Sequence, residues 1–188
     1  MGYGDEKLIK LLNAHKLRVY GNIFDGYYIK EDLYRFVLKK IFADKLYMYL
    51  PIRFIGCEEI SYLNVENMDF FCMNESGKIQ LGFKRTNIEV VENKLLESTL
   101  HNILQEVKKA NRSVEFMENG KIEISNNDFL YWKDYKMSYG KKMLYVMLFV
   151  LEIEKTMTYG KFTCGYEEAI LWKPIFHSML DTIEVRGK

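Results

Sequence analysis

The run from Met143 to Val150 constrains the fold of this 188-residue chain more than any other segment. Its residues are all apolar (Met-Leu-Tyr-Val-Met-Leu-Phe-Val), so no alternation separates a buried face from a wet face. A strand that is apolar on both faces lies inside a sheet that is covered on each side. The run is also well short of the about 20 residues that a membrane-spanning helix needs. We therefore expect a central strand with structure packed over both of its faces.

Several other segments predict strands of the same sheet. Residues 68–73 and 78–85 flank a turn sequence, Asn-Glu-Ser-Gly, whose glycine, Gly77, suits a tight hairpin. The chain from residue 17 to residue 50 is rich in aromatic and β-branched residues, and Pro51 ends its last strand because proline has no amide to donate. The remaining segments predict a meander of four strands and a fifth strand that returns, at 114–117, 121–124, 129–137, 143–152 and 156–164, with turns at Asn119-Gly120 and 138–140.

Two segments predict substantial helices. The first begins at Asn93 and ends near Asn111, with apolar residues at steps of three and four: Leu96, Leu100, Ile103, Leu104 and Val107. The second begins at about Glu167 and contains Pro174, so it either kinks there or has its main part starting near Trp172. Residues 1–16 predict a short amphipathic N-terminal helix.

The fold class that these elements predict is α+β. We expect an antiparallel sheet of about six to seven strands with two main helices packed on it. No repeat or linker interrupts the chain, so residues 1–188 are interpreted as a single domain, with the sheet domain at 17–188. The sequence leaves open whether residues 1–60 complete the sheet or form a separate lobe.

The last third of the chain also resembles a known family. Its pattern is the apolar run 143–150, then Tyr159-Gly160-Lys161-Phe162-Thr163-Cys164, then Trp172-Lys173-Pro174-Ile175 leading into 179–183. This is similar to the closing strand, strand and helix of the PsbP-like fold family, and the similarity covers about residues 65–185. Members of that family are largely non-enzymatic binding or assembly proteins, so the resemblance implies no catalytic residues. The Lys-, Asn-, Ile- and Tyr-rich composition resembles that of uncharacterised proteins of AT-rich bacteria.

Charge and cysteine content exclude several function classes. The chain has 27 Lys and Arg residues against 26 Asp and Glu residues, so its net charge of +1 predicts neither a nucleic-acid nor a membrane partner. Three cysteines at irregular spacing predict no disulfide framework. The first residues lack the basic and apolar regions of a secretory signal, so we expect a cytoplasmic protein.

The sequence contains few residues whose spacing is typical of a catalytic, metal or cofactor site. No histidine spacing predicts a metal site, and no glycine-rich loop predicts a bound nucleotide, so we expect neither a metal nor a cofactor. Cys164 at a strand end, together with His177 on the following helix, is the one candidate nucleophile and base, but a small core residue explains Cys164 better. Glu152 and Glu154 could form a carboxylate pair, although a solvated strand end explains them better. We expect that the protein is not an enzyme.

Aromatic residues around a turn are the best binding candidates. Phe24, Tyr27 and Tyr28 surround the turn at Asp25-Gly26, and aromatics at a loop are candidate interface anchors. The leading hypothesis is therefore a non-catalytic domain that binds or assembles with another protein. The alternative is a protein that binds a small apolar ligand in a pocket lined by Tyr, Phe and Met between sheet and helices. An exposed edge strand could also pair two copies as a homodimer.

Overall fold

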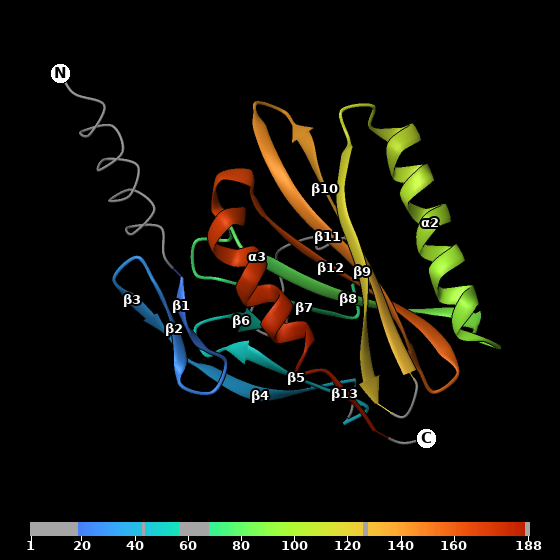
Figure 1. The fold of residues 1–188 in the computed structure, drawn as a ribbon, viewed down its shortest axis with the longest axis horizontal. Coiled ribbons are helices and arrows are strands. Elements are labelled where there is room, and N and C mark those ends of the chain that lie inside the picture. The colour runs from blue at the N-terminus through green and yellow to red at the C-terminus, as the bar shows by residue number, and fades with distance from the viewer. Residues whose placement is uncertain (1–18, 43, 57–67, 126–127, 187–188) are drawn as a thin grey trace, which may run out of the picture.

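The computed structural model describes residues 19–42, 44–56, 68–125 and 128–186. Within these ranges the chain forms two helices and three antiparallel sheets (Figure 1). The helix predicted over residues 1–16 lies outside the described residues. The antiparallel sheet and two packed helices predicted from the sequence are confirmed.

The largest sheet has seven strands, in the order β6-β7-β8-β12-β11-β10-β9. The predicted hairpin around Gly77 is present as β7 and β8. Asn74 shapes its turn, because Asn74 Oδ1 accepts the amide N–H groups of Lys78 and Ile79. The strands are β6 (Ile55–Gly56), β7 (Phe70–Met73), β8 (Gln80–Glu89), β9 (Glu115–Ser125), β10 (Asp128–Tyr139), β11 (Lys142–Ile153) and β12 (Thr156–Gly165).

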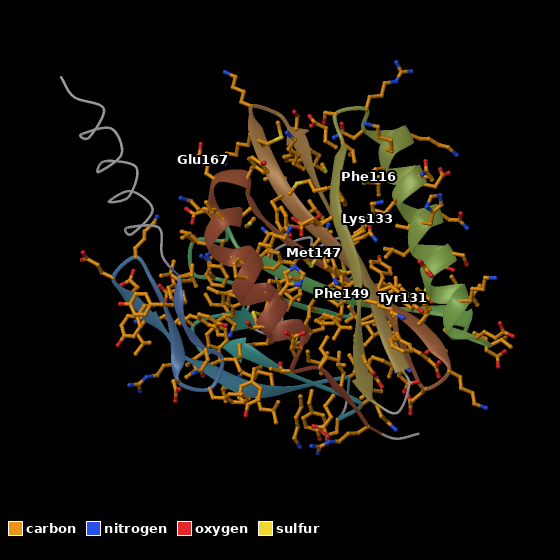
Figure 2. The ribbon with its side chains drawn as sticks, in the orientation of Figure 1. Phe116, Tyr131, Lys133, Met147, Phe149 and Glu167 are labelled. Atoms are coloured by element: carbon orange, nitrogen blue, oxygen red, sulfur yellow. The ribbon has the colours of Figure 1, made fainter. Side chains whose placement is uncertain are left out.

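Strand β11, which holds the apolar run, is an interior strand of this sheet, as predicted. Its neighbours are β10 and β12, and residues 145–151 are all buried. Val146, Leu148 and Val150 belong to the core cluster that contains the apolar face of helix α2 (Asn93–Ala110). Met147 and Phe149 alternate with them and belong to the cluster that contains helix α3 (Tyr166–Leu180). Figure 2 labels both side chains near the centre of the molecule.

The two helices lie on opposite faces of the large sheet (Figure 1). Helix α2 buries Leu96, Leu100 and Leu104 against β10 and β11, which is the stripe that the sequence predicts. Helix α3 begins at Tyr166 and continues through Pro174 to Leu180, so its main part does not start at Trp172. Because both faces of β11 are covered, almost all of the apolar run is removed from water.

The turn predicted at Asn119-Gly120 is wrong. Strand β9 runs through both residues without a break, and Gly120 pairs with Trp132 on β10. The indole explains the glycine, because a Cβ on Gly120 would lie 2.9 Å from Cζ2 of Trp132. The first two strands of the predicted meander are therefore one strand, β9, and the meander consists of β9, β10, β11 and the returning strand β12.

A second glycine is required inside the core. Gly160 on β12 pairs with Phe149 on β11, and the phenyl ring occupies the space above the glycine. A Cβ on Gly160 would lie 1.9 Å from Cζ of Phe149, which is far inside van der Waals contact. The ring of Phe149 also packs edge-on against Phe83 of β8 at 5.3 Å between centroids. Gly160 thus makes room for a ring that joins three adjacent strands.

Strands from the N-terminal third of the described chain, together with β13 near its C-terminal end, form two small sheets beside the large one. One sheet has the order β1-β2-β3, and the other has the order β13-β5-β4. Strand β5 is the most buried of these strands, and it packs against α3. The strands are β1 (Tyr20–Asn22), β2 (Gly26–Ile29), β3 (Asp32–Tyr34), β4 (Phe36–Ile41), β5 (Leu46–Pro51) and β13 (Glu184–Val185).

Candidate interaction surface

The turn between β1 and β2 presents an aromatic side chain to solvent. Phe24 is 75% exposed, the highest value of any aromatic residue in the described chain. Asn22 fixes the turn, because its Oδ1 accepts the amide N–H groups of Phe24 at 2.8 Å and Asp25 at 2.9 Å. Gly21 must be glycine, since a Cβ there would lie 2.1 Å from the carbonyl oxygen of Gly26. The backbone that carries Phe24 is thus held in one conformation.

The three aromatic residues predicted as binding residues lie in different environments. The ring of Phe24 meets Tyr49 of β5 edge-on, with 5.5 Å between centroids. Tyr28 is 38% exposed and stacks on Tyr20 at 5.0 Å. Tyr27 turns inward, where its hydroxyl is hydrogen-bonded to Ser178 Oγ of α3 at 2.7 Å. Phe24 and Tyr28 are accessible to a partner, whereas Tyr27 attaches β2 to α3.

Further apolar side chains are exposed on the neighbouring elements. Leu38 of β4 is 40% exposed and pairs with Tyr49, the residue that Phe24 contacts. We call the exposed set on β1, β2, β4 and the adjoining turns the N-terminal apolar surface, which comprises Tyr20, Phe24, Tyr28, Leu38 and Ile52. Tyr20, Leu38 and Ile52 were not predicted from the sequence as binding residues. A short strand such as Phe-Val-Leu-Lys-Lys-Ile has the composition of a half-buried strand, and only the sheet order shows that it is an edge.

Cys164 and His177 are both located on elements that face the core. Cys164 is 1% exposed, and burial raises the pKa of its thiol to about 12. His177 packs against Trp132, with 4.5 Å between ring centroids. Burial and the neighbouring Lys173 charge lower the pKa of the imidazole. The environment of Cys164 thus favours the neutral thiol, whereas a nucleophile requires the thiolate.

A buried carboxylate joins helix α3 to the sheet. Asp134 of β10 is fully buried, and its Oδ2 lies 2.7 Å from Lys173 Nζ of α3 and accepts the Tyr145 hydroxyl at 2.8 Å. Its Oδ1 accepts the amide N–H of Glu118 at 2.6 Å, at the point where the register of β9 against β10 shifts. Burial and the adjacent carboxylate raise the pKa of Tyr145, which keeps its hydroxyl as a donor.

The same carboxylate affects the lysine. Burial alone would lower the pKa of Lys173, but hydrogen bonds to Asp134 and Glu118 outweigh it and raise that pKa. Lys173 Nζ pairs with both carboxylates, and the buried Asp134 and Tyr145 side-chain oxygens each have a partner within the group. The arrangement therefore fits a structural role, in which three strands and one helix are held together by a paired charge.

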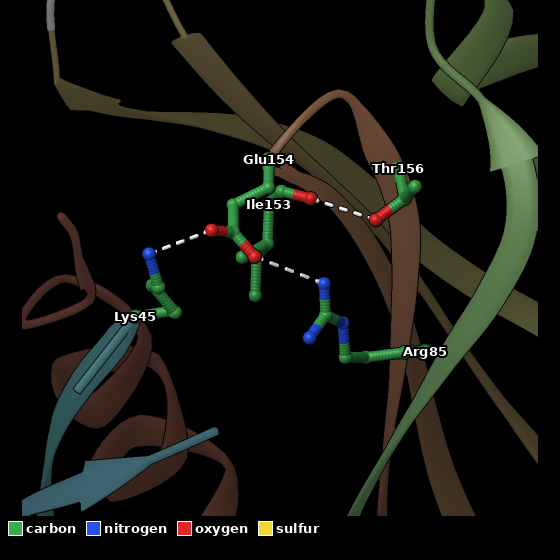
Figure 3. A network of polar contacts seen from close by, with 5 residues as sticks. All are labelled: Lys45, Arg85, Ile153, Glu154 and Thr156. Atoms are coloured by element: carbon green, nitrogen blue, oxygen red, sulfur yellow. Dashed lines mark hydrogen bonds and ion pairs between the residues drawn. The ribbon is translucent and has the colours of Figure 1, made fainter. Parts of the chain in front are cut away.

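Glu154 forms a second polar junction, between the small and large sheets (Figure 3). Its Oε1 lies 2.6 Å from Lys45 Nζ, beside β5, and its Oε2 lies 3.1 Å from an Arg85 nitrogen on β8. The hydrogen bond from Lys45 lowers the pKa of Glu154, and Arg85 lowers it further, against a smaller effect of burial. Glu154 belongs to the turn after β11 and pairs with these cations, so it forms no carboxylate pair with Glu152 in the described chain.

The described residues form two surface hollows that bear on the ligand-binding alternative. One, of about 500 Å³, lies beside Asp69, Lys84 and Arg85, and polar residues form the rest of its wall. The other, of about 220 Å³, lies between α2 and the sheet, beside Glu97, His101 and Tyr131. Neither has the wall of Tyr, Phe and Met that the ligand-binding alternative requires.

A lysine also contacts an aromatic ring between β9 and β10. Figure 2 labels Phe116 and Lys133 in the region of β9 and α2, where Lys133 Nζ lies 5.0 Å from the Phe116 ring centroid.

Neither a metal cluster nor a membrane-spanning helix is present among the described residues. Within them, no group of three or more His, Cys, Asp or Glu side chains is placed to hold a metal ion. None of the helices in this part of the chain combines the length and apolar character that crossing a membrane requires.

Comparison with solved structures identifies the fold. No model of a known protein family matches the sequence, and no curated protein matches it. The solution structure of cyanobacterial PsbP (CyanoP) from Synechocystis sp. PCC 6803 is similar over 80% of this chain and 92% of that one, with a TM-score of 0.60 and 11% identity. The Ran-binding protein Mog1p of Saccharomyces cerevisiae is similar over 81% of this chain and 96% of that one, with a TM-score of 0.54 and 8% identity.

These similarities define the class of fold to which the chain belongs. This chain combines a seven-stranded antiparallel sheet with a helix on each face, and its similarity to both structures shows that it has the PsbP-like fold. The resemblance predicted from residues 143–183 is confirmed for the fold. At 8–11% identity, it transfers no site residue from either protein.

Proposed function

We propose that this protein is a non-catalytic domain that binds or assembles with another protein through its N-terminal apolar surface. The observation that carries the proposal is Phe24, three-quarters exposed on a turn whose backbone Asn22 holds through two hydrogen bonds. Exposed aromatic side chains are enriched among residues that dominate binding energy at protein interfaces. A rigid backbone lowers the entropy that is lost when such a residue is immobilised by a partner.

The surroundings of Phe24 support the proposal. Exposed apolar residues scattered singly are normal, but a group on adjacent elements indicates a contact surface. Phe24 contacts Tyr49, and Tyr49 pairs with the exposed Leu38, so these three side chains are linked. The structural neighbour Mog1p is itself a Ran-binding protein, which supports protein binding as a use of this fold without indicating a partner for this chain.

The proposal that the domain is not an enzyme rests on its titratable groups. Cys164 is held as a buried thiol, and Asp134 is fully engaged by three donors. We place the protein in the cytoplasm because Cys164 is a buried free thiol, as is usual in a reducing compartment.

Site-specific crosslinking in the organism of origin tests the proposed surface. A photoreactive phenylalanine analogue replaces Phe24 in one variant and Val91 in a matched control, because Val91 is 82% exposed outside this surface. We expect a discrete crosslinked protein from position 24 that is absent from position 91. Identical products from both positions, or none from position 24, would contradict the proposed surface.

A further inference from the structure

Strand β4 is the last strand on one side of its sheet, whose order is β13-β5-β4. Its four central residues, 37–40, are all exposed, although alternate residues point to opposite faces. No described residue pairs with the outer edge of β4, and Figure 1 shows the strand along the lower margin of the molecule. An edge of this kind presents backbone donors and acceptors to which another strand can be added.

The hydrogen bonds of β5 show which groups of β4 point outward. The amide N–H of Tyr49 donates to Thr182 Oγ1 at 3.1 Å, so it points away from its paired residue, Leu38. Arg35 and Ile52 are opposite each other three residues further along the same ladder. They form a hydrogen-bonded pair, since the Ile52 amide donates to the Arg35 carbonyl at 2.9 Å. In an antiparallel ladder these two kinds of pair alternate. The amide and carbonyl groups of Leu38 and Lys40 therefore point to the outer edge.

The segment that contains β4 is strongly basic. Strand β4 has two lysines, Lys39 and Lys40, and no acidic residue, and Arg35 directly precedes it. Lys40 is paired with Asp44 at 3.0 Å, whereas Lys39 has no ion-pair partner in the part of the chain that the structure describes. The edge therefore favours a negatively charged strand, because opposite charges on adjacent strands attract and like charges repel.

The same charges disfavour a second copy of this chain as the added strand. Pairing β4 with β4 of another molecule would join two positive segments in one sheet, and lysines on an edge are a common means of preventing such pairing. The N-terminal apolar surface adjoins the edge, since Leu38 belongs to both. A partner strand on β4 would thus lie beside Leu38, and Phe24 contacts Tyr49, the residue on β5 that pairs with Leu38.

We propose that the partner contributes an extended acidic segment that adds to β4 as an antiparallel strand, and this inference rests on the proposed function. The order of residues in β4 determines the sequence that fits. In an antiparallel pair the partner residue opposite Lys40 comes first, followed by those opposite Lys39, Leu38 and Val37. The segment that fits therefore has two consecutive acidic residues followed by two or more apolar residues.

A synthetic peptide tests the inference on the full-length protein. The probe carries Glu-Glu-Val-Val-Val between Gly-Ser flanks, and the control carries the reverse order, Val-Val-Val-Glu-Glu. We expect the probe to shift the backbone amide NMR signals of Leu38 and Lys40 and to bind at least tenfold more tightly than the control. Equal binding of both peptides, or no binding of the probe up to about 1 mM, would overturn the inference.

Two variants of Leu38 separate backbone recognition from side-chain contact. Leu38→Pro removes an outward amide without breaking the ladder to β5, because proline is tolerated at such edge positions. Leu38→Ala removes the side chain and keeps the amide. We expect Leu38→Pro to weaken probe binding at least tenfold relative to Leu38→Ala, with the NMR spectrum elsewhere unchanged. Equal affinity for the two variants would refute strand addition.

A charge-reversal variant, an oligonucleotide and the oligomeric state provide three further tests of strand addition. The double substitution Lys39→Glu and Lys40→Glu should weaken probe binding at least tenfold. A single-stranded oligonucleotide that shifts the same signals as strongly as the probe would show a general anion site and overturn the proposal. So would a dimer in sedimentation that Leu38→Pro abolishes. If the probe fails while Phe24 still forms its discrete crosslink, strand addition fails and the proposed function stands.

Discussion

The ion pair between Asp134 and Lys173 provides the sharpest prediction about stability. In the Lys173→Met variant the side chain keeps most of its apolar stem but loses its charge. The fully buried Asp134 carboxylate then keeps only the Tyr145 hydroxyl and the Glu118 amide as donors. Breaking a buried ion pair by removing one partner costs about 3–5 kcal/mol. Because the Lys173 side chain is 20% exposed, water can reach the vacated site, and we expect a loss near the lower end, about 3 kcal/mol.

A matched substitution and a double variant complete the cycle. Lys109→Met removes a lysine whose pair with Glu106 is exposed, so it should cost only about 0.5 kcal/mol. Adding Asp134→Asn to Lys173→Met removes the buried charge, and the double variant should therefore be roughly 2 kcal/mol more stable than the sum of the single effects predicts.

Urea unfolding measures the unfolding free energy of wild type, of Lys173→Met, Lys109→Met and Asp134→Asn, and of the double variant. Trp132 and Trp172 report on the transition, since Trp132 contacts α3 and Trp172 belongs to it. Strict additivity of Asp134→Asn and Lys173→Met, or a Lys173→Met effect no larger than that of Lys109→Met, would refute the assignment of Lys173 as the partner of a buried carboxylate.

Three further predictions follow from the packing and the charges. Gly160→Ala should lower the unfolding free energy by about 3 kcal/mol or more, because the new Cβ would overlap the Phe149 ring, and partial recovery in a Phe149→Leu background would identify the clash. Glu154 has a folded pKa below its ordinary value of 4.5, so its contribution is present above that value and lost as pH falls through the folded pKa. The stability difference between wild type and Glu154→Gln should therefore shrink from pH 7 into acid, and a difference that persists below both pKa values would contradict the ion pairs. Cys164 should resist iodoacetamide at pH 8 until urea unfolds the chain, and rapid labelling of its peptide in the native protein would show an accessible thiolate.

Sequence patterns predicted those elements whose periodicity continues over many residues. The apolar run of β11 identified an interior strand, because a strand that is apolar on both faces is removed from water only when both faces are covered. The spacing of Leu96, Leu100 and Leu104 likewise identified α2 and the face that it buries. These features depend on neighbours along the chain, and a single sequence contains that information.

Features that depend on distant residues were missed. Asn119-Gly120 has the composition of a turn, yet Trp132 on the adjacent strand fills the space above the glycine and lets β9 continue. The burial of Asp134 depends on Lys173, which is far along the chain on another element. Neither relation leaves a signal in the local sequence.

The interaction surface could be predicted only in part. Aromatics at a turn indicated Phe24 and Tyr28, which are exposed, but they also indicated Tyr27, whose hydroxyl is bonded to α3. The near-neutral total charge concealed the basic segment around β4, because a sum over the chain averages local excesses away. The exposed edge itself follows from sheet order, which residue patterns do not specify.

The affinity of the crosslinked partner, measured with purified proteins, tests the central claim most directly. Titration calorimetry would compare the wild type with Phe24→Asp and with Val91→Asp, which places the same charge at a similarly exposed site elsewhere. If the N-terminal apolar surface binds the partner, Phe24→Asp weakens binding at least tenfold, about 1.4 kcal/mol, and Val91→Asp leaves it within about twofold. Equal affinities for the two variants would contradict the claim that this surface is the binding site.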